Sequence, residues 1–126
     1  MIEVSAELIE AVEEKYTSNF TVVGIYFGEG DPEKGGQHWN FTQSIGDDED
    51  KGICVVKEVQ EIVFYGNIEE FVISKKQLKC VFSDSMIETT GTKDLIINYN
   101  ISDQKWSEIS VMAKKIFKGE SYFRIT

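Results

Sequence analysis

The chain has 126 residues, of which 41% are hydrophobic and 12% aromatic. This composition is too apolar for a disordered chain, and the length suits one domain over residues 1–126. No apolar run approaches the ~18 residues that a membrane span needs, and Met1 is not followed by a basic and then apolar leader, so we expect neither a membrane segment nor a signal peptide.

The net charge of −9 is unevenly distributed along the chain. Residues 1–63 hold 14 acidic and 4 basic side chains, a net charge of −10, whereas residues 64–126 hold 8 acidic and 9 basic ones. The acidic half would repel nucleic acid and anionic membranes and attract a basic protein. The alternative is that this charge only keeps the chain in solution. The two cysteines fit a reducing compartment, so we expect a cytoplasmic protein.

The first segment is ambiguous, because residues 2–14 alternate as a strand does at their start and follow helical spacing later. Residues 20–27 are rich in β-branched and aromatic side chains and predict a strand. The glycine-rich segment 28–36, which contains the only proline, predicts a loop.

The middle of the chain predicts further strands. Residues 39–45 form one, with Trp39 and Phe41 on the same face, and residues 53–59 form a second that continues extended to residue 65. Between them lies a charged loop, and Gly66 with Asn67 signals a turn. Residues 71–82 predict a β-hairpin, residues 94–101 another strand, and residues 122–125 a last edge strand.

Residues 103–118 predict the clearest helix. Ser102 or Asp103 can cap its start, lysines lie near its end, and Gly119 stops it. Its apolar stripe points Trp106 toward the core, together with Ile109, Met112, Ala113 and Ile116. The chain is therefore predicted to be α+β, a largely antiparallel sheet of about six to seven strands with one C-terminal helix packed on it.

Candidate catalytic groups are few. His38 is the only histidine, and Cys54 and Cys80 lack the paired spacing of a zinc site, so we expect no metal and no cofactor. A Cys–His pair is conceivable, but both cysteines lie in apolar strands where burial would make them inert. We predict an ordinary loop histidine at His38 and no enzymatic activity.

The charged loop holds the most concentrated acidic run, Asp47, Asp48, Glu49 and Asp50. It lacks the spacing of a calcium-binding loop, and the glycines at 28–36 lack that of a phosphate loop. The run is either a solvated loop or a contact patch for the lysines and arginines of a partner. Among the aromatic residues, Tyr65 is the one we expect to be exposed, because it lies beside the predicted turn.

Residues 39–82 resemble the Immunity protein 10 family of bacterial toxin–immunity systems. The resemblance follows an order of features: a strand over 39–44, the acidic loop, a strand over 53–58, the segment 65–68 and the hairpin. The family has a Tyr-Gly-Gly-Ile-like turn where this chain has Asn67 in place of the second glycine, and asparagine tolerates the same positive φ. Beyond these residues the likeness extends loosely over 20–101, and it implies a β-rich N-terminus, hence a strand at 2–14.

The resemblance implies a protein that binds and blocks one cognate toxin, which could be a basic nuclease. The residues we expect at the contact are Asp47, Asp48, Glu49 and Asp50, with Tyr65 and Asn67 beside them. A small enzyme using His38, or a β-rich ligand-binding module with a concave apolar pocket, is the alternative.

Overall fold

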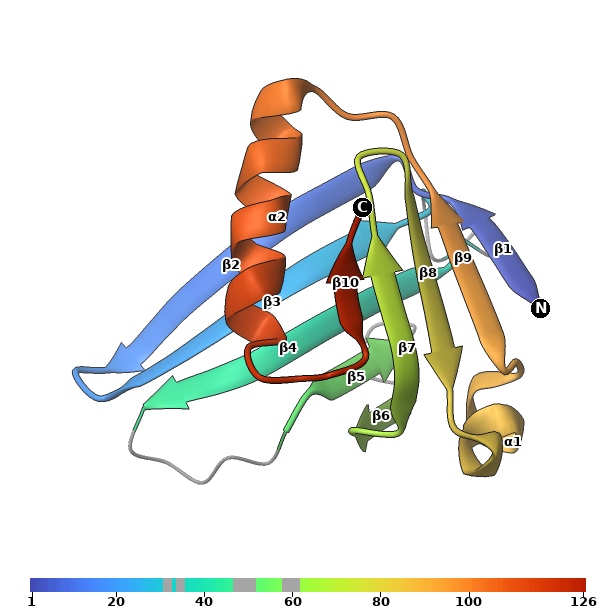
Figure 1. Ribbon diagram of the computed structural model, residues 1–126, viewed down its shortest axis with the longest axis horizontal. Coiled ribbons are helices and arrows are strands. Elements are labelled where there is room, and N and C mark those ends of the chain that lie inside the picture. The colour runs from blue at the N-terminus through green and yellow to red at the C-terminus, as the bar shows by residue number, and fades with distance from the viewer. Residues whose placement is uncertain (31–32, 34–35, 47–51, 58–61) are drawn as a thin grey trace.

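A computed structural model describes residues 1–30, 33, 36–46, 52–57 and 62–126. It has two five-stranded sheets packed face to face (Figure 1). The main helix packs on the sheet that contains residues 20–28, next to the other sheet. None of the helices in these residues is long and apolar enough to cross a membrane.

The first sheet, here called the meander sheet, is antiparallel throughout, and each strand pairs with the next one in sequence. Short turns suffice for such neighbours. Its strands are β2 (Leu8–Thr17), β3 (Phe20–Gly28), β4 (His38–Gly46), β5 (Cys54–Lys57) and β6 (Ile62–Tyr65).

The second sheet, here called the mixed sheet, has the order β1-β9-β8-β7-β10. The three central strands pair antiparallel, whereas β1 joins β9 and β10 joins β7 in parallel. The two ends of the chain thus supply its two edges. The strands are β1 (Ile2–Ser5), β7 (Ile68–Ile73), β8 (Gln77–Phe82), β9 (Asp94–Asn98) and β10 (Phe123–Ile125).

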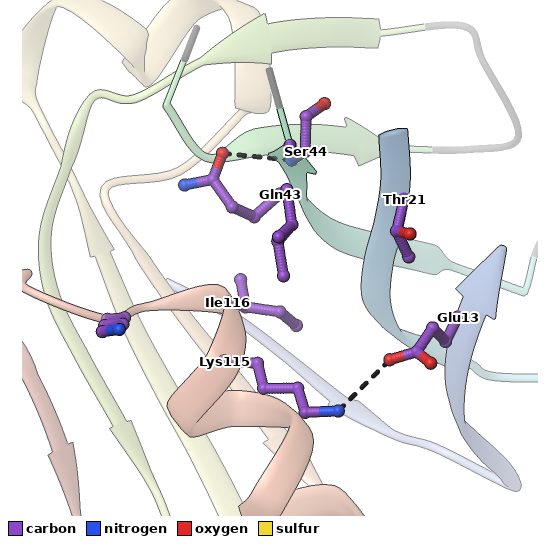
Figure 2. Close-up of a pocket in the computed structure, with 9 residues that line it drawn as sticks. Glu13, Thr21, Gln43, Ser44, Lys115 and Ile116 are labelled. Carbon is purple, nitrogen blue, oxygen red and sulfur yellow. Dashed lines mark hydrogen bonds and ion pairs between the residues drawn. The ribbon is translucent and has the colours of Figure 1, made fainter. Parts of the chain in front are cut away.

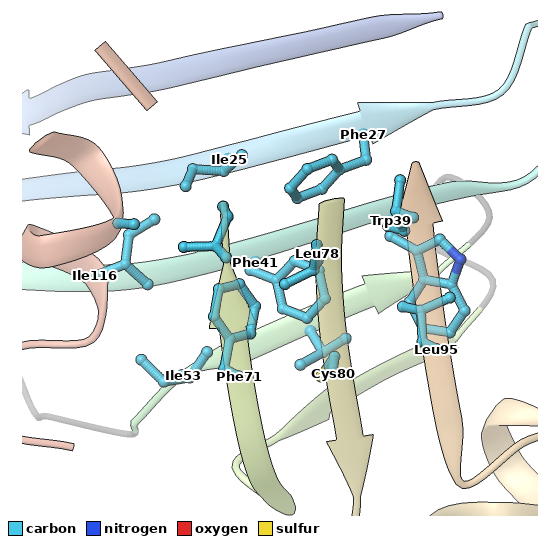
Figure 3. Close-up of a cluster of buried hydrophobic side chains, with 14 of the residues drawn as sticks. Ile25, Phe27, Trp39, Phe41, Ile53, Phe71, Leu78, Cys80, Leu95 and Ile116 are labelled. Carbon is cyan, nitrogen blue, oxygen red and sulfur yellow. The ribbon is translucent and has the colours of Figure 1, made fainter. Parts of the chain in front are cut away.

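The core lies between the two sheets, where alternate side chains of both meet (Figure 3). Trp39 of β4 stacks on Phe82 of β8, with ring centroids 5.7 Å apart, and Phe41 meets Phe71 edge to face at 5.2 Å. Cys80 is fully buried in this layer, and burial raises the pKa of its thiol well above the ordinary value.

The helix α2 (Asp103–Ile116) confirms the predicted helix. The Ser102 hydroxyl caps it by accepting from the Lys105 amide at 3.1 Å. Its apolar stripe packs on β3, with Ile109, Met112, Ala113 and Ile116 buried. Trp106 packs against the edge of the core, on the side predicted for it, but it is only partly buried.

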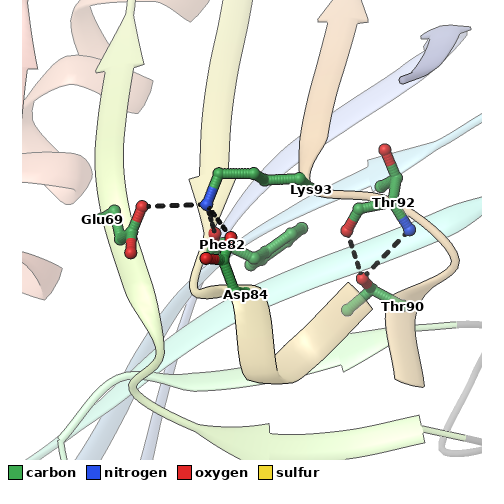
Figure 4. A network of polar contacts seen from close by, with 6 residues as sticks. All are labelled: Glu69, Phe82, Asp84, Thr90, Thr92 and Lys93. Carbon is green, nitrogen blue, oxygen red and sulfur yellow. Dashed lines mark hydrogen bonds and ion pairs between the residues drawn. The ribbon is translucent and has the colours of Figure 1, made fainter. Parts of the chain in front are cut away.

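Residues 83–93 contain a 3-10 turn η2 (Asp84–Met86) and the short helix α1 (Ile87–Thr90). The Lys93 ammonium binds the carboxylates of Asp84 at 2.5 Å and Glu69 at 3.2 Å (Figure 4). These acids raise the pKa of Lys93. The contact joins this connection to the start of β7.

The α+β class is confirmed, but the single sheet of six to seven strands was wrong, because ten strands divide between two sheets. The segment 2–14 is extended, as the lean toward a strand required, yet it contains two strands that belong to different sheets. Its early alternation comes from β1, and the chain changes sheet at Ala6 and Glu7, whose amides bond to Asn98 and Gly28 respectively. Alternation indicates a strand but not its partner, which is why sequence could not separate the sheets.

Candidate functional site

Two of the predicted contact residues lie where β6 leads into β7: Tyr65 is the last residue of β6, and Asn67 lies in the turn that follows. Tyr65 is 49% exposed, as predicted. Asn67 has a φ of 61°, which confirms that asparagine takes the left-handed conformation here, and its Nδ2 donates to the Tyr65 carbonyl at 2.9 Å. This bond ties the Asn67 side chain to the end of β6, where the Tyr65 side chain is exposed.

The acidic run Asp47, Asp48, Glu49 and Asp50 lies outside the described residues. Its flanks are described: Gly46 ends β4, and residues 52 and 53 lead into β5. The Gly66 amide donates to the Ile53 carbonyl at 2.7 Å. The chain therefore returns from the acidic run directly beside the turn that carries Tyr65.

The face of the meander sheet turned away from the core, here called the outer face, brings together residues far apart in sequence. The mixed sheet and α2 both lie on the opposite side of this sheet (Figure 1). One cross-strand row crosses all five strands, and each residue in it pairs directly with the next. Its middle residues are small and its end residues are large. The row is Val12, Gly24, Thr42, Cys54 and Tyr65.

Large apolar side chains are exposed at both edges of the outer face. On β2, Leu8 is 48%, Val12 39% and Tyr16 61% exposed, and on β6 Val63 is 46% exposed. Together with Tyr65 they expose apolar surface to water on either side of a lower centre, where the side chains are small. Exposed apolar surface grouped on one face is typical of a protein-binding surface.

The centre of the row is hollowed over Gly24. The hollow has a volume of about 290 Å³ and is lined by Val12, Glu14, Tyr16, Val22, Asn40 and Thr42. A Cβ on Gly24 would lie 2.8 Å from the Thr42 methyl and 3.4 Å from Asn40 Oδ1, so the absence of a side chain keeps the hollow open. Asn40 Oδ1 is buried and has no hydrogen-bond partner among the described residues.

A larger cleft of about 560 Å³ lies on the inner side of the same strands, where they extend past the mixed sheet (Figure 2). The end of α2 forms one wall, and Lys115 Nζ bonds Glu13 Oε1 across it at 3.2 Å. The ion pair is half exposed, so it holds the helix to β2 only weakly. The cleft is lined by Glu13, Thr21, Gln43, Ser44, Ile45, Gly46, Lys115, Ile116 and Lys118.

His38 is not the loop residue we predicted. It begins β4, is only 6% exposed, and its Nδ1 shares a hydrogen bond with the Tyr26 hydroxyl. Cys54 pairs with Thr42, and Thr42 lies four residues along β4 from His38. At the usual strand rise, Thr42 and His38 are roughly 13 Å apart. The structure does not bring these two groups together as a catalytic pair.

The cysteines occupy different environments. Cys80 is in the core, as predicted, whereas Cys54 is partly exposed on the outer face, so the prediction of two buried thiols was wrong for Cys54. In the part of the chain that the structure describes, no three His, Cys, Asp or Glu side chains are grouped as metal ligands would be.

Sequence reasoning missed the hollow and the row that crosses it. Gly24 lies inside a strand pattern, which is a signal for a close approach of other atoms, but its neighbours across the sheet could not be read from the pattern alone. No family model, no curated protein and no solved structure matches this chain.

Proposed function

We propose that this protein is an immunity protein that binds and neutralises a cognate bacterial toxin. The observation that carries the proposal is the outer face of the meander sheet, a broad sheet surface with exposed apolar side chains at both edges. Aromatic side chains, tyrosine among them, are enriched in such surfaces and supply much of the affinity in protein complexes.

The charge of the chain supports a basic partner. The net charge is −9, and the acidic excess falls in the first 63 residues, which contribute the whole of β2, β3, β4 and β5. A negative surface steers a positively charged protein into contact and raises the association rate. A nuclease domain, which must bind polyanionic nucleic acid, has the complementary charge.

The position of the turn at Tyr65 and Asn67 fits the same surface. Tyr65 ends the cross-strand row, and residue 53 beside it leads out of the acidic run. We propose Asp47, Asp48, Glu49, Asp50, Tyr65 and Asn67 as contact residues at this border of the outer face. Blocking would be steric, because a bound sheet face covers the active surface of the toxin.

A ligand-binding module is the second candidate, and the cleft at the end of α2 is the observation in its favour. Its volume of about 560 Å³ falls within the range of small-molecule sites. Its walls carry an ion pair and polar side chains rather than the mainly apolar lining of such sites, so we place this candidate second.

The test is co-expression with the product of the gene directly upstream, followed by affinity capture and a growth assay. We expect a stable complex and protection from the toxin. Tyr65→Ala should weaken the complex at least tenfold, about 1.4 kcal/mol, whereas Val111→Ala should not. Val111 is the matched control, because it is 52% exposed on α2, away from the outer face.

A second pair of variants tests the acidic run. Replacing Asp47, Asp48, Glu49 and Asp50 by Asn or Gln should slow association and flatten its salt dependence, because mobile ions screen attraction beyond about 8 Å at physiological ionic strength. Melting temperature should not change. Unaltered association kinetics would show that the acidic run only solubilises the chain.

A further inference from the structure

The last strand of the meander sheet, β6, pairs with β5 along one edge only (Figure 1). The Gly66 amide donates to the Ile53 carbonyl at 2.7 Å, and these two residues continue the β5–β6 register by one step. In an antiparallel ladder, residues that bond to the neighbouring strand alternate with residues whose backbone groups point away from it. Phe64, two residues before Gly66, therefore bonds to β5, whereas the backbone N–H and C=O groups of Val63 and Tyr65 point to the free edge.

This free edge offers hydrogen-bonding groups that the described part of the chain leaves unused. The Tyr65 carbonyl accepts from Asn67 Nδ2 at 2.9 Å. No described residue bonds to the Tyr65 N–H, or to the N–H and C=O of Val63. The edge thus presents two donors and one acceptor, and Val63 supplies one of each, which are the groups that an added strand would bond to.

The opposite edge of the same sheet is protected against strand pairing, whereas β6 is not. β2 contains three glutamates and a register shift between Lys15 and Thr17, and lysines of α2 bind two of those glutamates at 3.3 Å and 3.2 Å. Charges, irregular pairing and a covering helix are the usual means by which proteins keep an edge from pairing. The four residues of β6, Ile62–Tyr65, carry no charge, include no proline and all favour strands. A further strand can therefore add to the sheet at β6.

The charge of the meander sheet decides what kind of strand fits there. Among its described residues, Glu10 and Glu14 lie on the outer face, whereas Lys15 and Lys57 alternate onto the inner side. Residues 1–63, which supply all of this sheet except the end of β6, hold 14 acidic and 4 basic side chains. A second copy of the chain would bring two such surfaces together and be repelled, whereas a basic chain is attracted.

We propose that the free edge of β6 takes up an extended strand of the basic partner protein, which becomes the sixth strand of the meander sheet. The added strand bonds to both backbone groups of Val63, and its side chains extend the outer face beside Tyr65. Main-chain hydrogen bonds supply affinity in this mode of recognition, and alternate side chains supply specificity. The inference deepens the proposed function and rests on it for the existence of a partner, but the edge can be tested without one.

The experiment is an NMR titration of the ¹⁵N-labelled full chain with the peptide Ac-Arg-Thr-Val-Thr-Val-Thr-Arg-NH2, an uncharged strand between two arginines. We expect shift changes centred on the amides of Val63 and Tyr65 and slower hydrogen exchange at both, because their N–H groups gain acceptors. The same peptide with its three central amides N-methylated should bind about tenfold more weakly, because it loses the donors of an added strand. A peptide with glutamate in place of both arginines should also bind more weakly.

The variant Val63→Pro removes the free N–H without breaking a bond to β5, since proline is accepted on an edge strand where the N–H faces solvent. It should weaken binding of the arginine peptide about tenfold, whereas Val63→Ala, which keeps the N–H, should weaken it less. If Val63→Pro does not fold, the N-methylated peptide decides. Equal binding of the methylated and unmodified peptides, or unchanged hydrogen exchange at Val63 and Tyr65, would overturn the proposal.

Sedimentation of the free chain tests the other occupant of this edge. We expect a monomer, and a dimer that Val63→Pro dissociates would assign the edge to a second copy instead. The titration contains no toxin, so a failed neutralisation assay argues against the proposed function alone. A failed titration beside intact neutralisation argues against the β6 edge alone.

Discussion

The ring of Phe117, directly after α2, lies 4.0 Å from the ring of Phe71 on β7, centroid to centroid. A second ring, Phe123 of β10, stacks on Phe117 at 5.2 Å and nearly parallel, at 13°. The helix end, the mixed sheet and its last strand therefore share one aromatic contact. Phe117 is 1% exposed, so its removal would leave a cavity where these elements meet.

Phe117→Ala should lower the free energy of unfolding by about 3–5 kcal/mol, the usual cost of deleting a buried aromatic side chain. Chemical denaturation with urea measures it. A loss below about 1 kcal/mol would mean that the end of α2 does not depend on this ring.

Trp106→Ala should cost less than Phe117→Ala, about 1–3 kcal/mol, although tryptophan is the larger residue. The reason is that Trp106 is only partly buried, so a smaller apolar area returns to water on unfolding. The same urea experiment compares the two variants. Equal losses would show that the indole is as well packed as the phenyl ring.

The ion pair between Lys75, in the β7–β8 turn, and Asp103, at the first turn of α2, predicts a weak acid sensitivity. The hydrogen bond from Lys75 holds the pKa of Asp103 below its ordinary value. A group whose pKa is lowered on folding stabilises the fold above the unfolded pKa of about 3.9, and loses that contribution as pH falls through the folded pKa. Asp103→Asn should therefore flatten the stability curve below about pH 4, measured by melting temperature against pH, while Glu88→Gln should not.

The two thiols should differ in reactivity. Cys80 is fully buried with a raised pKa, and Cys54 is partly exposed on the outer face. A thiol reagent at neutral pH should label Cys54 in the native protein and Cys80 only on unfolding, because the thiolate is the reactive form and burial disfavours it. Mass spectrometry of digested samples reads both sites. Rapid labelling of Cys80 without unfolding would contradict the packing of the core.

Substitution should destabilise the protein strongly at Gly46 and hardly at all at Gly66. Gly46 has a φ of 140°, and a Cβ there would lie 1.7 Å from the Asn19 carbonyl oxygen, so Gly46→Ala should cost more than the roughly 1–3 kcal/mol of backbone strain alone. Gly66 has a φ of 64° with nothing near its Cβ position. Gly66→Asn should change stability by less than about 1 kcal/mol, because asparagine adopts this conformation. Thermal melts of the two variants provide the comparison.

Local patterns in this chain predict elements well. The helical spacing from Ile109 to Ile116 and the cap at Ser102 located α2, and the β7–β8 hairpin followed from two apolar segments around a polar tip. Each depends on neighbours within a few residues, which is the range that a sequence pattern samples.

Long-range pairing could not be predicted in the same way. β1 pairs with β9, and nothing near Ile2 specifies Leu95 as its partner. The candidate site has the same origin: Val12, Gly24, Thr42, Cys54 and Tyr65 meet only because five strands align in one register. Tyr65 could be predicted as exposed from the turn beside it, whereas the hollow over Gly24 could not.

The parallel edges of the mixed sheet have a consequence for synthesis on the ribosome. The meander sheet can form as the chain emerges, since each strand pairs with its predecessor. β1 must wait for β9, and Asn98 donates to Glu3 over a separation of 95 residues. Closing so long a loop is entropically costly, so β1 should join the sheet late. Until β1 and the C-terminal strand β10 are both in place, the edges of the nascent mixed sheet lack their strands, which makes this stage exposed to aggregation and to chaperones.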